Sequence, residues 1–130
     1  MNPRALAFIS VGIVGFLVQT AVLAVLALAA RWPVPLAAAV AVEAAVVTNF
    51  FWHERWTWRD RCDTTTRWLR LARFHMTNGV TSFVGNTVLT VLLANGFGLS
   101  PIAGNAIAVA VLGVVNFVAA DRWVFVSRQT

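Results

Sequence analysis

The chain has 130 residues, of which 59% are hydrophobic and 12% are charged, and its mean hydropathy is +0.76. Soluble domains carry about 25% charged residues, so this composition excludes an ordinary soluble fold and predicts a membrane protein. The formal net charge is +5 and all ten basic residues are arginine. Because the sequence contains no soluble basic module, we expect no nucleic-acid partner.

Four apolar stretches approach the length needed to cross a membrane, since a hydrocarbon core about 30 Å thick requires roughly 20 helical residues. They cover residues 6–30, 35–52, 76–97 and 101–120, and Glu43 is the only charge inside them. The short connectors "RWPVP" and "GFGLS" join them into two hairpins. The first stretch is longer than the apolar region of a signal peptide, so we interpret it as a retained helix. The predicted fold class is an all-α polytopic membrane protein with four transmembrane helices.

The two hairpins are related by an internal repeat. The segment "NFFWHERWTWRDR", residues 49–61, returns as "NFVAADRWVFVSR", residues 116–128. Each unit holds two spans, and an even number of spans preserves orientation, which predicts two parallel-orientation two-helix repeats. We expect residues 1–58 to form the first repeat and residues 76–130 the second. Between them, residues 59–75 are expected to form a cytoplasmic linker with an interfacial amphipathic helix.

The arginines predict the orientation of the chain. Nine of them lie at the termini or in the central segment, and only Arg31 lies between the first two spans. The positive-inside rule then places both termini and the central linker in the cytoplasm. In the linker, Arg67, Arg70 and Arg73 share one arc of the predicted helix. They suit either bilayer phosphates or the phosphate of a specific lipid.

The sequence contains few residues suited to covalent or metal chemistry. Cys62 is the only cysteine, so no intrachain disulfide can form. Cys62, His53 and His75 lack the spacing of metal ligands, and no cofactor-binding motif is present. We therefore expect no metal, no cofactor and no enzyme active site.

Glu43 is a candidate functional residue because it lies about midway along the second span. A charged side chain at the bilayer centre costs roughly 2.5 to 3.5 kcal/mol on insertion scales. Its repeat equivalent is Ala110, so any role of Glu43 is performed once per chain. The alternative is a protonated glutamic acid that only joins helices.

The repeated motif supplies an amide, an acid, an arginine and an indole in each half. Asn49 and Asn116 each precede a tryptophan, Trp56 or Trp123, by seven residues, which is two helical turns on one face. Such a face could line a polar path toward the cytoplasm. Both tryptophans, together with Trp58 and Phe125, also suit a simple anchoring role in the headgroup layer.

An acid directly precedes each arginine of the motif, and neighbouring helical residues do not face each other. Glu54 and Asp121 are therefore predicted to pair across the two halves, Glu54 with Arg122 and Asp121 with Arg55.

These motifs resemble those of the GtrA-like family of small bacterial membrane proteins. That family repeats Arg-Phe near a Gly at the start of an odd span, and Asn-Phe followed by Arg-Trp-Thr-Phe at the end of an even span. The matching segments are "RFHMTNGVTSF", "NFFWHERWTW" and "NFVAADRWVF", and the resemblance covers nearly the whole chain. The first span departs from the pattern because no Arg directly precedes Phe8, and Val124 replaces the usual Thr.

The resemblance implies a multi-pass protein of the bacterial cytoplasmic (inner) membrane that translocates a polyprenyl-phosphate-linked sugar for cell-envelope polysaccharide glycosylation. The implied partners are that lipid-linked sugar, anionic lipid and a polyprenyl-phosphate glycosyltransferase, and a homodimer is compatible with the sequence. Arginine suits a lipid phosphate because its planar fork donates two hydrogen bonds. We expect this role for Arg55, Arg122, Arg73 and Arg70. We assign the sugar or its path to Glu43, Asn49, Asn116, Trp56 and Trp123.

Two other functions compete with this one. The chain could be a non-transporting accessory subunit that docks a glycosyltransferase or holds its lipid substrate. A proton-coupled exporter of small drugs would also have four spans and a membrane glutamate. Such exporters work as dual-topology dimers with a weak charge bias, and the strong bias of this chain disfavours that function.

Overall fold

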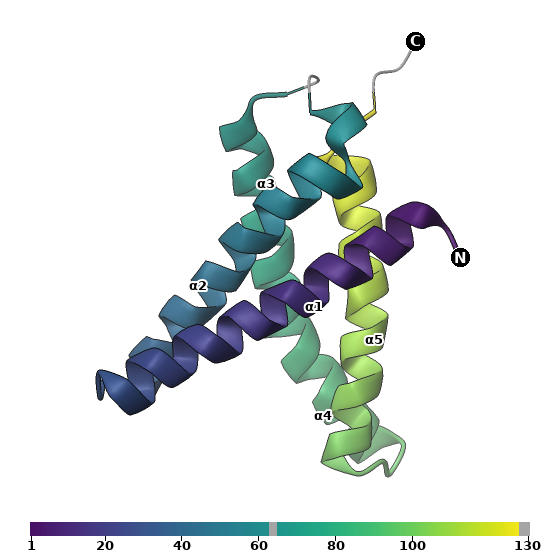
Figure 1. Cartoon of the computed structure of the whole chain (residues 1–130). Helices are drawn as coiled ribbons and strands as arrows, with labels where there is room; N and C mark the ends of the chain where they lie inside the picture. Colours follow the sequence, from purple (N-terminus) through teal and green to yellow (C-terminus); the bar gives the residue numbers. More distant parts are fainter. Residues whose placement is uncertain (63–64, 128–130) are drawn as a thin grey trace. The chain divides into compact units, whose positions relative to one another are not determined.

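The computed structural model describes residues 1–62 and 65–127, and every regular element in them is helical. Four helices are long and apolar enough to span a membrane: Pro3–Ala29, Val34–Thr57, Arg67–Gly96 and Pro101–Val124. The all-α fold with four spans is thus confirmed. The chain divides into two compact units, Met1–Cys62 and Asp63–Thr130, and the second is described over residues 65–127. Each unit is one helical hairpin (Figure 1).

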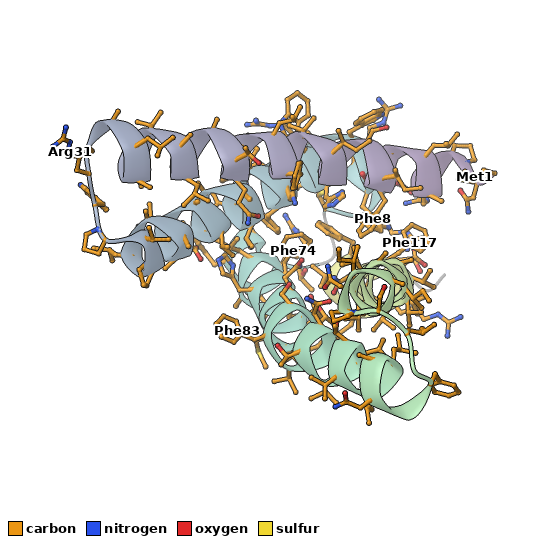
Figure 2. All side chains as sticks on the ribbon, turned by 90° about the horizontal axis from the view of Figure 1, so that it is seen from below. Met1, Phe8, Arg31, Phe74, Phe83 and Phe117 are labelled. Carbon is orange, nitrogen blue, oxygen red and sulfur yellow. The ribbon has the colours of Figure 1, made fainter. Side chains whose placement is uncertain are left out.

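The first unit begins with helix α1 (Pro3–Ala24), which ends in a π-helical turn, η1 (Val25–Ala29). The Asn2 side chain accepts a 2.9 Å hydrogen bond from the backbone N–H of Arg4 and so caps α1. Arg31 adopts a left-handed backbone conformation (φ 57°) in the turn that follows. Figure 2 shows Arg31 at the opposite end of the helix from Met1. Helix α2 (Val34–Trp52) then returns beside α1.

Small residues line the seam between α1 and α2. The buried residues of α1 are Ala7, Val11 and Gly15, and those of α2 include Ala37, Ala41 and Ala45. Both sets recur every fourth residue, which places each on one face of its helix. Small side chains let two backbones approach closely, and this replaces the hydrophobic effect as the source of helix association in lipid.

An aromatic cluster closes the end of the first unit. Helix α2 continues as a π-helical turn, η2 (His53–Thr57), and then a 3₁₀ turn, η3 (Arg59–Arg61). Phe8 stacks on the His53 ring, with centroids 4.9 Å apart, and Trp58 contacts both rings edge-on. His53 Nδ1 and Thr57 Oγ1 share a 2.9 Å hydrogen bond across η2. The cluster fixes the start of α1 against the end of the second span.

The second unit begins with a long continuous helix made of α3 (Arg67–Gly79), the π-helical segment η4 (Val80–Gly85) and α4 (Asn86–Gly96). The Thr66 side chain caps its first turn. The predicted amphipathic segment therefore continues without a break into the helix of the third span. Helix α5 (Pro101–Ala119) follows a turn in which Gly98 has φ 68°. At Gly104 of α5, an added Cβ would lie 3.3 Å from the Thr90 carbonyl oxygen of α4.

Both copies of the repeated motif end in the same irregular turn. The π-helical turns η2 (His53–Thr57) and η5 (Ala120–Val124) occupy equivalent places in the repeat. Each closes with a 2.8 Å backbone bond between residues five apart, from Trp58 to His53 and from Phe125 to Ala120. Such turns are rare in proteins overall, but many of those that occur lie at functional sites. The repeat is therefore preserved in backbone geometry as well as in sequence.

Around the π turn, the aromatic side chains of the motif are either partly exposed or fully buried. Trp56 and Trp123 are 52% and 42% exposed, whereas Trp58 and Phe125 are fully buried. Trp58 and Phe125 have no exposed ring surface with which to anchor the chain among headgroups, whereas the rings of Trp56 and Trp123 remain available for that role. The wider π turn rotates the following residue away from the position that a regular α-helix would give it, and its side chain points inward.

Candidate functional site

Arg73 and Trp123, both predicted site residues, meet in the second unit. The Arg73 guanidinium lies 5.6 Å from the centre of the Trp123 ring. Its Nη1 also donates a 3.0 Å hydrogen bond to the Trp123 carbonyl oxygen. Trp123 lies in the last turn of its span, where backbone carbonyl groups lack partners inside the helix, so a cation there is favourable. The contact therefore places a cation and a half-exposed indole side by side at one end of the hairpin.

Arg70 lies one turn before Arg73, but its surroundings differ. It is 4% exposed, and its Nη1 donates to the carbonyl oxygen of Thr65, just before α3. A buried guanidinium engaged by the backbone is less available to a lipid phosphate than Arg73 is. Its role in phosphate binding stays a prediction.

Arg55 and Arg122 occupy equivalent positions in η2 and η5, and both are exposed. The Arg55 guanidinium lies 5.8 Å from the centre of the Phe51 ring, one turn earlier in the same span. Glu54 is buried and Asp121 half-buried. The predicted pairs Glu54 with Arg122 and Asp121 with Arg55 join two units that are described separately, so they stay predictions.

The asparagines of the motif face the neighbouring helix of their own hairpin. In the first unit the Asn49 amide lies directly on α1, where any Cβ at Gly15 would overlap it. Its Oδ1 is buried and has no hydrogen-bond donor among the described residues. In the second unit Asn116 Oδ1 accepts a 2.7 Å hydrogen bond from the Thr81 hydroxyl of η4. Both amides lie at a helix–helix seam, whereas Trp56 and Trp123 are partly exposed.

A polar seam runs between the two spans of the second unit, and we define it as Thr81, Asn86, Thr90, Asn105 and Asn116. Beyond the bond of Thr81 to Asn116, Asn86 Oδ1 is buried without a donor among the described residues. Further along, the Thr90 hydroxyl lies 3.5 Å from Asn105 Oδ1. The π-helical segment η4 helps to align the polar seam. Its hydrogen bond between residues five apart joins the Asn86 N–H to the Thr81 carbonyl oxygen, so these two residues lie one above the other on the helix.

Of the five residues of the polar seam, the sequence analysis singled out Asn116 and neither threonine. A threonine in a membrane helix often bonds to its own backbone, so neither hydroxyl gave a signal. The equivalents of Thr81, Asn86 and Thr90 in the first repeat are Val14, Gln19 and Leu23. The polar seam is therefore a property of the second hairpin.

Glu43 lies on the face of α2 away from α1. The seam of α2 passes through Ala41 and Ala45, and Glu43, two residues from each, falls on the opposite side of the helix. The Glu43 side chain is exposed in the structure. Its repeat equivalent Ala110 is also exposed, so the two positions share a helix face as well as a place in the repeat.

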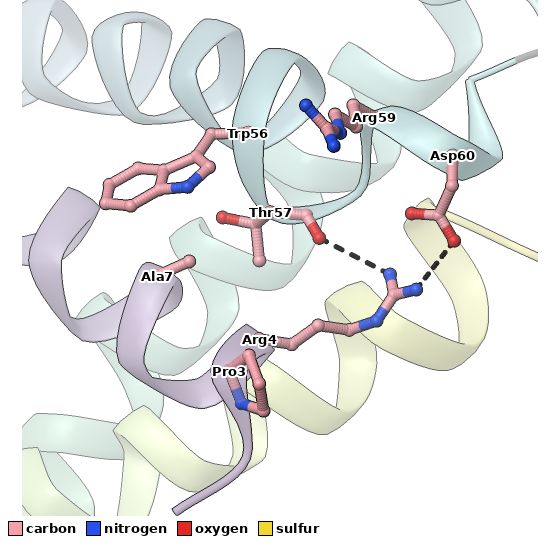
Figure 3. A pocket seen from close by; sticks show the side chains of 7 residues that line it. All are labelled: Pro3, Arg4, Ala7, Trp56, Thr57, Arg59 and Asp60. Carbon is pink, nitrogen blue, oxygen red and sulfur yellow. Dashed lines mark hydrogen bonds and ion pairs between the residues drawn. The ribbon is translucent and has the colours of Figure 1, made fainter.

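A pocket that sequence reasoning did not predict lies at the end of the first unit (Figure 3). Arg4 Nη2 forms a 2.6 Å ion pair with Asp60 Oδ2, and Arg4 Nη1 donates a 3.3 Å hydrogen bond to the Thr57 carbonyl oxygen. Trp56 and Arg59 complete the polar and aromatic lining of a space of about 460 Å³. The hydrogen bond from Arg4 lowers the pKa of Asp60, so Asp60 is ionised at neutral pH.

The ion pair also shows which chain segments share one end of the hairpin. Arg4 stands at the start of the first span and Asp60 just after the second, so the N-terminus and the central segment lie at the same end of the unit. Cys62 belongs to this end as well, because its thiol donates to the carbonyl oxygens of Glu54 and Trp58 at 3.2 and 3.4 Å. Among the described residues, no three side chains of His, Cys, Asp or Glu gather as metal ligands would.

Comparison with known proteins identifies the family. A search of curated proteins gives no match. A family model described as "GtrA/DPMS, transmembrane domain" matches residues 7–125. The match includes both hairpins, both asparagines at the helix seams and both arginine–tryptophan pairs of the repeated motif. The chain is therefore a multi-pass membrane protein that belongs to the GtrA/DPMS transmembrane domain family.

Proposed function

We propose that the protein translocates a polyprenyl-phosphate-linked sugar across the bacterial cytoplasmic membrane for glycosylation of cell-envelope polysaccharide. Its family is associated with sugar-linked lipid translocation or glycosylation. Both termini and the central linker lie on the cytoplasmic side in this proposal, following the charge bias. The sugar crosses unchanged, so the chain performs no covalent step.

The polar seam of the second unit is the observation that carries the proposal. Arg73 and Trp123 stand at one end of this hairpin, and Thr81 follows Arg73 by eight residues, roughly 12 Å deeper along a helix. An arginine can hold the phosphate as a fork, and the amides and hydroxyls of the seam can exchange hydrogen bonds with sugar hydroxyls. Polar groups at membrane depth are costly, and a path for a polar headgroup explains why so many lie on one seam.

Anionic lipid is the second ligand of this proposal. Exposed arginines at the cytoplasmic end attract negative headgroups, and Arg55 and Arg122 are both exposed. Such lipids would hold the hairpin ends at the interface while Arg73 engages the substrate. A homodimer is compatible with this scheme and is not required by it.

The family's association with glycosylation favours one second candidate, an accessory subunit that docks a polyprenyl-phosphate glycosyltransferase or holds its lipid substrate. Purified protein in liposomes distinguishes the two functions. The probe is a short-chain isoprenyl phosphoglucose in one leaflet, and its appearance in the other leaflet is measured over time. Faster crossing than in protein-free liposomes supports translocation. Capture of the glycosyltransferase with no faster crossing supports the accessory function.

A further inference from the structure

The pocket at the end of the first unit has a lining that suits a charged sugar headgroup. Its charged groups are the guanidinium groups of Arg4 and Arg59 and the carboxylate of Asp60. Trp56 forms one wall with its indole, and Figure 3 shows it on the other side of Thr57 from the Arg4–Asp60 pair. A small ligand site combines an aromatic surface with a few convergent polar groups in this way.

We propose that this pocket binds the sugar-phosphate headgroup of the lipid substrate on the cytoplasmic side before translocation. This inference rests on the proposed function and adds to it a docking site, made of Arg4, Trp56, Arg59 and Asp60, that lies outside the polar seam. Arg59 contacts the phosphate, the Arg4–Asp60 pair contacts sugar hydroxyls, and the Trp56 indole packs on the sugar ring.

The charges of the pocket match this ligand. A phosphate that joins a sugar to a polyprenol is a diester and carries one negative charge. Two guanidinium groups and one ionised carboxylate leave the pocket with one net positive charge. The carboxylate matters for the sugar, because an ionised Asp only accepts hydrogen bonds and therefore suits hydroxyl donors. Asp60 is accessible for that purpose, with 55% of its side chain exposed.

Stability alone does not account for the ion pair. Exposed ion pairs contribute little to folding because water screens them and both side chains lose freedom. Arg4 and Asp60 are 29% and 55% exposed, and the same end of the hairpin is already closed by the ring cluster of Phe8, His53 and Trp58. The pair therefore organises a surface more than it stabilises the fold.

The charged residues of the pocket are present in the first repeat only. Trp56 has the equivalent Trp123, but the equivalents of Arg4, Arg59 and Asp60 are Leu71, Val126 and Ser127. The second repeat thus retains the exposed indole and has no charge at the three other positions. A role common to both hairpin ends, such as anchoring in the interface, would not require charges in one copy only.

Binding of two probes to the purified full chain tests the site. One probe is a short-chain isoprenyl phosphoglucose and the other is the same isoprenyl phosphate without the sugar. Asp60→Asn should weaken binding of the phosphoglucose roughly tenfold, the value of one charged hydrogen bond, and leave the sugar-free probe nearly unchanged. Arg59→Gln should weaken both probes, since it removes the phosphate contact.

Arg61→Gln is the matched control, because it removes one positive charge from the same turn and Arg61 does not line the pocket. Because Arg61 adds only a minor Coulombic contribution at Asp60, this variant should weaken both probes far less than Arg59→Gln does. If an amide at residue 60 impairs folding, Asp60→Ser installs the side chain that the second repeat carries at the equivalent position and should give the same loss for the phosphoglucose. Monodisperse elution of each variant checks its fold.

The outcomes separate the pocket from the proposed function. Wild-type affinity of the Asp60 and Arg59 variants for both probes, in a protein that still accelerates phosphoglucose crossing, overturns the pocket and leaves the function standing. A wild-type protein that binds neither probe overturns both. If Arg61→Gln and Arg59→Gln weaken binding of the probes equally, the effect comes from general surface charge, and the proposed pocket is also overturned.

Discussion

The guanidinium of Arg73 covers the Trp123 ring at 5.6 Å and bonds to the carbonyl oxygen of the same residue at 3.0 Å. The two residues are 50 positions apart, and one belongs to the Arg-Phe element of the family pattern while the other belongs to the second arginine–tryptophan pair. Two motifs that sequence analysis treated as separate signatures therefore form one structural unit at the end of a hairpin.

Replacing Arg73 with Lys should lower the rate of phosphoglucose crossing in liposomes. Lysine keeps the positive charge but loses the planar fork that can bond to a carbonyl oxygen, a phosphate and an aromatic face together. We expect a loss of roughly tenfold, in line with one charged hydrogen bond. Arg31→Lys, at an exposed position in the turn between α1 and α2, is the control and should keep the wild-type rate. Full activity of the Arg73 variant would restrict Arg73 to an anchoring role.

Gly15 and Asn49 should behave as a coupled pair in a double-mutant cycle. A Cβ at Gly15 would overlap the Asn49 amide, so Gly15→Ala should destabilise the protein by about 1 to 3 kcal/mol, as overpacking does. Removing the amide with Asn49→Ala should make Gly15→Ala much less harmful. Gly12→Ala is the control, because nothing lies within 4 Å of a Cβ there. Thermal unfolding in detergent measures all four variants, and additive losses would contradict the contact.

The bond between Thr81 and Asn116 should matter more for transport than for stability. Hydrogen bonds between membrane helices contribute about 0.6 kcal/mol on average, so Thr81→Val should shift the unfolding midpoint only slightly. The same change removes a hydroxyl from the polar seam and should slow phosphoglucose crossing severalfold. Thr87→Val, at an exposed position six residues further along, should affect neither quantity. A large loss of stability with an unchanged crossing rate would assign Thr81 to packing.

Cys62 reports the orientation of the chain. We expect it to face the cytoplasm, so a membrane-impermeant thiol reagent added to intact cells should not label it. The thiol donates to two backbone carbonyl groups, and this partial burial could also slow labelling. Inverted membrane vesicles provide the control, since the reagent should reach Cys62 there. Labelling in intact cells at the rate seen in inverted vesicles would reverse the topology.

The sequence contains enough information for the spans and for part of the site, and the reasons differ from residue to residue. Apolar runs with few charges predict four helices because backbone polar groups in the hydrocarbon core must form their hydrogen bonds within the protein. Family motifs identified Arg73 and Trp123, although their contact depends on the fold. The Arg4–Asp60 pair was missed because its residues are 56 positions apart and Arg4 had a sufficient explanation as a topology signal.

The π-helical turns were also beyond sequence reasoning. A regular period of 3.6 residues predicts which residues share a helix face, and it placed Asn49 and Trp56 on one face. The turn between His53 and Thr57 changes that phase, so the amide of Asn49 lies at the seam with α1 while the Trp56 indole is half exposed. No propensity of the residues in "HERWT" or "ADRWV" distinguishes a π turn from an α turn.

Glu43 provides the last test, because it is the one charged residue inside the apolar core of a span and it breaks the repeat at Ala110. It lies on the opposite face of α2 from the alanines that pack on α1. Glu43→Gln keeps the shape and hydrogen-bonding capacity of the side chain, and we expect normal folding and slower phosphoglucose crossing. Ala41→Gln, which inserts the same amide into the α1–α2 seam, is the contrasting variant and should instead lower stability through overpacking. If the Glu43→Gln variant moves the probe across the membrane at the wild-type rate, Glu43 only joins helices, and the path rests on the polar seam of the second hairpin alone.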